Sequence, residues 1–193
     1  MKAKKIQDAV LIGEWKEVNG TELDGKGLDG IVLSGMETAF GVTNANGERY
    51  TREALDKFVQ DYFVANDLNV PLTLMHGERF EDIIGKVLSI DVTDEGFKIL
   101  AYIPKTAPRY EAVKAFLQEG ILQGFSKDGW ATGFEEKEDE EGSTFFEISE
   151  LALTAVSLVT TPANALTFDS VKVTNATKFH KQYPTDEYKE FFN

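Results

Sequence analysis

The sequence contains no cysteine. Disulfides, thiolate metal sites and cysteine nucleophiles are therefore excluded together. Histidine is also scarce, because His76 and His180 are the only two in the chain. This scarcity argues against a zinc site built from several histidines. It also leaves two candidates for any reaction that needs a histidine base.

Long apolar runs and an excess of basic residues are missing too. No run approaches the roughly 20 apolar residues that a membrane-spanning helix needs. The stretch after the basic start carries Gln7, Asp8, Glu14 and Lys16, which a signal-peptide core would not tolerate. The formal net charge of -13 would repel a phosphate backbone. We therefore expect a soluble, unexported protein with neither a membrane nor a nucleic acid as partner.

The chain is long enough for one domain with a substantial core, since it has 193 residues of which 42% are hydrophobic. The hydrophobic pattern weakens after Phe168. We therefore predict a single domain over residues 1–170, followed by a tail or terminal helix over 171–193.

The pattern within the domain predicts more strand than helix. A loop is expected at 19–30 and a solvated acidic turn at 135–142. One helix is expected from a cap at Thr51 to about residue 66, and a second from about Pro108 to Gln118. Strands are predicted at 9–18, 31–40, 70–76, 83–92, 97–103, 121–135 and 144–160. These elements favour an α+β fold, a single β-barrel-like domain of about seven strands with flanking helices.

Three segments carry residues that could perform nucleophilic catalysis. A serine hydroxyl needs a base within hydrogen-bond reach, and that base needs a group to orient it. His76 ends a predicted strand, Ser126 lies between Gly124 and Gly129, and Glu150 enters the last strong strand. Taken singly, each fits an ordinary role as a structural histidine, a loop serine or a solvent-facing glutamate. Residue chemistry alone leaves the choice open.

The order of four short motifs adds information. His76 is followed by Gly-Lys-Val at 85–87, then by Gly-Phe-Ser at 124–126, and finally by VSLVTTPAN at 156–164. In these motifs the chain resembles the prohead proteases of HK97-like tailed phages, over about residues 32–168. The resemblance implies a fold like that of the herpesvirus maturation proteases.

The resemblance also implies roles. Ser126 would be the nucleophile and His76 its general base, with no cofactor. The implied substrates are the scaffolding segment of the major capsid protein and the protease itself, inside the assembling prohead in the host cytoplasm. Related herpesvirus enzymes dimerise, which suggests a homodimer by analogy alone.

Members of this family often carry acids seven and two positions before the serine of the last motif. In this chain those positions hold Glu150 and Ala155. Glu150 is therefore expected to orient His76. The backbone amides of Lys127, Asp128 and Gly129 are candidates for an oxyanion hole, by proximity to the serine.

Two further side chains near the serine have expected positions. The side chain of Lys127 is expected to point to solvent. Trp130 is expected in the core or in the wall of the barrel.

Other functions remain open at this stage. The protein could be an inactive protease-fold scaffold or capsid-assembly protein, in which Ser126 would be replaceable. It could also be a small acidic binding domain unrelated to phage, in which Ser126 and His76 would lie far apart. His180 competes for the role of base, although a surface histidine in the tail is the favoured interpretation.

Overall fold

The computed structural model describes residues 4–160, apart from 24–25, 45, 65–69 and 95. In chain order the elements are β1 (Lys4–Leu23), β2 (Lys26–Ala39), β3 (Glu48–Tyr50), α1 (Arg52–Phe58), the π-helical turn η1 (Val59–Val64), β4 (Pro71–Leu74), the 3-10 turn η2 (Phe80–Asp82), β5 (Ile83–Val92), β6 (Gly96–Pro104), α2 (Tyr110–Gln118), β7 (Gly124–Glu138) and β8 (Thr144–Val159). The prediction of a mostly β fold with two helices is confirmed. No helix in these ranges is long and apolar enough to cross a membrane.

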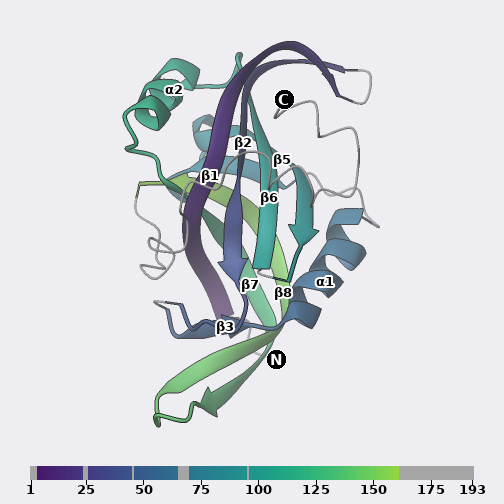
Figure 1. The fold of residues 1–193 in the computed structure, drawn as a ribbon, viewed down its shortest axis with the longest axis vertical. Coiled ribbons are helices and arrows are strands. Elements are labelled where there is room, and N and C mark those ends of the chain that lie inside the picture. Colours follow the sequence, from purple (N-terminus) through teal and green to yellow (C-terminus); the bar gives the residue numbers. More distant parts are fainter. Residues whose placement is uncertain (1–3, 24–25, 45, 65–69, 95, 161–193) are drawn as a thin grey trace.

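One sheet contains all eight strands, in the order β3-β8-β4-β5-β6-β2-β1-β7. β8 pairs in parallel with β3 and β4, and the other pairs are antiparallel. β7 stands at the end of this order but pairs in addition with β8. The sheet is therefore strongly curled, and β7 has a hydrogen-bonded neighbour on both sides. Figure 1 shows the outer part of the β7–β8 hairpin projecting beyond the rest of the fold.

The two helices lie at opposite ends of the fold (Figure 1). α1 begins where the Thr51 hydroxyl accepts a hydrogen bond of 3.1 Å from the Ala54 amide, as the predicted cap requires. Its apolar side packs on β8, with Leu55 and Phe58 fully buried. α2 buries one face and ends before Gly120, whose φ of +65° suits a glycine C-cap.

Residues 19–23 and 26–30 do not form the loop that the glycine-rich pattern predicted. They form the paired ends of β1 and β2, with Asn19 opposite Asp29 and Leu23 opposite Lys26. Gly30 is needed there for space, because a Cβ at this position would lie 2.0 Å from the Ile103 carbonyl oxygen. The glycine marks a close approach between two strands rather than a flexible segment.

The main core lies on the inner side of the curled sheet and is closed by α1. Its fully buried members include Leu55, Leu72, Phe97, Ile99, Phe125 and Leu158. The predicted domain boundary at residue 170, the tail at 171–193 and His180 lie outside the described residues.

Candidate active site

Strand β7 presents two chemically different faces. Phe125 and Lys127 are both 0% exposed and point into the interior. Because side chains alternate along a strand, Ser126 and Asp128 share the opposite, outer face. Trp130 follows on that outer face and is 45% exposed, so of its two expected places, the core or the barrel wall, the core is wrong.

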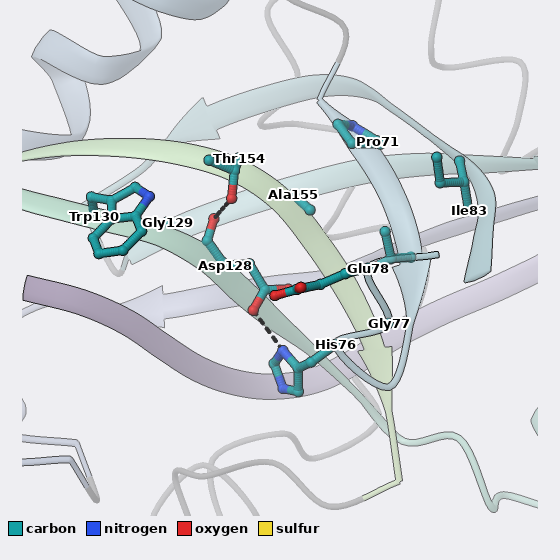
Figure 2. A pocket seen from close by; sticks show the side chains of 11 residues that line it. Pro71, His76, Gly77, Glu78, Ile83, Asp128, Gly129, Trp130, Thr154 and Ala155 are labelled. Atoms are coloured by element: carbon teal, nitrogen blue, oxygen red, sulfur yellow. Dashed lines mark hydrogen bonds and ion pairs between the residues drawn. The ribbon is translucent and has the colours of Figure 1, made fainter. Parts of the chain in front are cut away.

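His76 comes from the turn that follows β4. The end of β4 is fixed against β8, where the Met75 amide donates to the Leu158 carbonyl at 2.9 Å. Met75 and His76 then adopt the left-handed conformation, with φ of 53° and 58°. Such φ values are uncommon for residues other than glycine and are found at functional sites. The turn directs the imidazole towards the outer face of β7 (Figure 2).

The imidazole of His76 is hydrogen-bonded to a carboxylate. Its Nδ1 lies 2.7 Å from Oδ1 of Asp128, and the two side chains are 29% and 15% exposed. The other carboxylate oxygen, Oδ2, accepts a hydrogen bond of 2.7 Å from the Ser157 hydroxyl. Figure 2 shows the His76–Asp128 contact at the centre of the site.

Ser157 is held from three sides. Its hydroxyl oxygen accepts a hydrogen bond of 3.2 Å from the His76 backbone amide and lies 2.6 Å from the Thr73 hydroxyl. A hydroxyl has one proton, and that of Ser157 goes to Asp128, so Thr73 is the donor in the second contact. The network joins β4, β7 and β8, and both hydroxyl-bearing side chains are buried.

Ser126 lies next to this network in the sheet. Its Cα is paired with that of Ser157 on β8 and with that of Ala9 on β1. The side chain is 1% exposed. In the part of the chain that the structure describes, the hydrogen bond of the His76 ring goes to Asp128 and not to Ser126.

Glu150 is not brought to His76. Its carboxylate is 2.5 Å from Nζ of Lys57, and this hydrogen bond lowers the pKa of Glu150. Along β8 it pairs near Gly133, five residues before Ala155. At ~3.3 Å per residue this places it roughly 16 Å along the strand from the residue opposite Asp128. The expected orienting role for Glu150 is therefore corrected: it forms an ion pair with α1.

Lys127 is also placed differently from expectation. The side chain expected in solvent is fully buried, donates to the Thr38 hydroxyl at 2.7 Å, and holds Nζ 4.0 Å from the centre of the Tyr50 ring. It therefore cannot reach an oxyanion on the outer face. Residues 127–129 also pair with both β1 and β8, which engages backbone amides in the sheet. This geometry gives no support to the oxyanion hole predicted at Lys127, Asp128 and Gly129.

A pocket of about 300 Å³ adjoins the His76–Asp128 pair (Figure 2). Ile83 and Pro71 from β5 and β4 form one side, and Gly129 and Trp130 from β7 form the other. Glu78 contributes a second carboxylate (Figure 2). The pocket offers an apolar surface beside the imidazole.

Sequence reasoning missed the carboxylate of Asp128. It considered this residue for its backbone amide alone, although a residue two positions after a strand serine shares the serine's face. That period-2 relation was the available signal. Ser157 and Thr73 gave no comparable signal, because their contacts depend on strand pairing.

Comparisons with known proteins identify the family and a similar fold. A family model for caudovirus prohead serine proteases matches residues 16–182. The fold is similar to that of the capsid assembly protease gp21 of bacteriophage T4, with a TM-score of 0.66 and 17% sequence identity, over 82% of this chain and 99% of that one. No curated protein sequence matches this chain.

Proposed function

The chain belongs to the family of caudovirus prohead serine proteases, and we propose on this basis that it is a serine endopeptidase that cleaves capsid protein during prohead maturation. Ser126 is the nucleophile and His76 the general base. The observation that carries the proposal is the hydrogen bond of 2.7 Å between His76 Nδ1 and Asp128, two residues after Ser126 on the same face of β7. A histidine so placed has its Nε2 available as a base.

The proposed reaction is acyl transfer. Nε2 of His76 takes the proton of the Ser126 hydroxyl as Oγ attacks the peptide carbonyl carbon. The carbon–nitrogen bond then breaks, and the imidazolium gives that proton to the leaving amine. Water hydrolyses the acyl-enzyme by the same route. A conformational change must expose Ser126 to the substrate, because it is 1% exposed in this structure.

The setting of the reaction belongs to the same proposal. The substrates are the scaffolding segment of the major capsid protein and the protease itself, inside the assembling prohead in the host cytoplasm. The similar T4 protein is named as a capsid assembly protease, which supports a capsid partner. A homodimer is proposed by analogy. The curled sheet would correspond to the barrel of herpesvirus maturation proteases, and the pairing of β7 with both β1 and β8 supports this.

The test is the intact mass of the major capsid protein after co-expression with this chain. We expect the wild type to shorten the capsid protein and Ser126→Ala to leave it at full length. Ser143→Ala, in the exposed β7–β8 turn, is the matched control and should cleave like the wild type. Full-length capsid protein in assembled shells made with the wild type would refute the proposal.

A second candidate is an assembly protein that keeps the protease fold without activity. It is favoured by the burial of Ser126, which is 1% exposed. This candidate predicts that shells assemble with Ser126→Ala as well as with the wild type, and that neither shortens the capsid protein.

A further inference from the structure

We propose that the carboxylate of Asp128 on β7 orients the imidazole of His76. We also propose that an aspartate at position 155 on β8, where this chain has alanine, could orient the imidazole in its place. The inference rests on the proposed function and names the acid that this site uses. Sequence reasoning expected the acid on β8, at Glu150.

The contact itself has the geometry of an orienting carboxylate. A distance of 2.7 Å is typical of a charge-assisted hydrogen bond. A carboxylate accepts this bond from an Nδ1–H, so it favours the tautomer in which Nε2 carries no proton. Nε2 is then the atom that can accept the serine proton. Both carboxylate oxygens are engaged, one by His76 and the other by Ser157, which fixes the plane of the carboxylate.

The backbone around Asp128 is fixed as well. Asp128 pairs with Ala155 and Gly129 pairs with Leu153, so Thr154 is an extra residue in β8. This is a β-bulge, a feature that re-aims neighbouring side chains. The Thr154 hydroxyl donates to the Asp128 carbonyl at 3.1 Å and ties the bulge to β7.

Gly129 permits the close approach of the two strands at the bulge. A Cβ at this position would lie 2.2 Å from the Ala152 carbonyl oxygen. The carboxylate is therefore held by the bulge and by its hydrogen bonds together.

Register makes Ala155 the alternative position for the acid. Residues directly opposite on antiparallel strands have Cβ atoms about 4.5–5.5 Å apart and point to the same face. Ala155 is opposite Asp128 and lines the same pocket as His76. An aspartate at position 155 would lie within reach of the same imidazole, and its methyl group in this chain leaves the space for the Asp128 side chain.

The first test measures the histidine directly. In a His180→Gln background His76 is the sole histidine, so its imidazole nitrogens can be observed by 15N NMR at alkaline pH without overlap from another histidine. We expect the Nδ1–H tautomer in the protein with Asp128, and a shift towards Nε2–H in Asp128→Ala. An Nε2–H tautomer with Asp128 present would overturn the proposal. This readout does not depend on cleavage, so it stands apart from the proposed function.

The second test is a swap measured by capsid-protein cleavage. We expect Asp128→Ala to reduce the rate at least about 100-fold, as loss of an orienting acid does. The double variant Asp128→Ala/Ala155→Asp should cleave at least about 10-fold faster than Asp128→Ala. Asp128→Asn keeps the shape and serves where the alanine variant fails to fold. Glu147→Gln is the matched control, because this β8 carboxylate pairs with Lys137 on β7, away from the site.

Two results would overturn the inference while the proposed function stands. One is a folded Asp128→Ala variant that cleaves the capsid protein at the wild-type rate. The other is a loss of cleavage in Asp128→Ala that the folded double variant does not recover. Failure of the wild type to cleave would instead refute the proposed function. The NMR result alone would then decide whether Asp128 orients His76.

Discussion

At the scale of single residues, the turn after β4 depends on a glycine next to His76. A Cβ on Gly77 would lie 2.4 Å from the Cβ and Cγ of Asp82. Asp82 has little freedom to move, because Arg79 and Arg109 both contact its carboxylate, at 3.3 Å each. The carboxylate is largely buried, so the turn that aims His76 is packed against a fixed side chain.

We therefore expect Gly77→Ala to displace this turn. The overpacking should cost about 1–3 kcal/mol of unfolding free energy and reduce cleavage more than stability alone explains. Gly27→Ala is the matched control, since a Cβ there meets nothing within 4 Å and its cost should stay within about 0.5 kcal/mol. Urea denaturation and capsid-protein cleavage check both. Equal stability of the two variants would contradict this account.

At the scale of elements, α2 is anchored to β1 by Glu17. The Tyr110 hydroxyl donates to Glu17 Oε1 at 3.2 Å, and Lys114 Nζ lies 2.7 Å from Oε2. Burial, together with the charge of Glu17, raises the pKa of Tyr110 to about 12. The Lys114 hydrogen bond lowers the pKa of Glu17. The helix is therefore held by a contact that requires a protonated tyrosine.

This contact predicts an alkaline loss of stability. The ordinary pKa of tyrosine is about 10, so between pH 10 and about 12 the unfolded chain gives up this proton before the folded one does. Stability is fully present below pH 10 and falls as pH rises through this window, by roughly 2 kcal/mol. In Tyr110→Phe this part of the loss should be absent. Urea denaturation at pH 8 and pH 11 measures the difference; parallel losses in both proteins would refute the assignment.

At the scale of the whole molecule, β1 connects two parts of the sheet. Its second half pairs with β2, and residues 4–11 pair with residues 124–131 of β7. The latter include the strand segment of Ser126 and Asp128. Without residues 4–11, β7 would keep one neighbour in this region and expose an unpaired edge.

We expect deletion of residues 1–11 to lower the melting temperature by roughly 10 °C or more. The deletion removes the hydrogen bonds between β1 and β7, and it removes a strand that lies over the core. Deletion of 171–193, the predicted tail, is expected to leave the melting temperature unchanged. Thermal unfolding followed by circular dichroism tests both. A stable protein without residues 1–11 would show that β1 contributes little to the β7 site.

Much of the fold follows from local sequence. Alternating apolar residues predicted most strands, and the cap at Thr51 and the glycine after α2 predicted the helices, because these signals act within a few residues. The motifs around His76 and Ser126 predicted the family, which the family match confirms. The prediction of a loop at 19–30 was wrong because glycine occurs both in flexible loops and where strands pack closely. The sequence does not distinguish these two cases.

Tertiary structure alone decided which acid meets His76. The choice between Asp128 and Glu150 depends on the register of β7 against β8, on the bulge at Thr154 and on the turn after β4. These come from segments distant in the chain, so no local pattern contains them. In the same way, the alternation of side chains along a strand places Lys127 and Asp128 on opposite faces of β7. The curl of the whole sheet decides that the side chain of Lys127 is the one that points into the core.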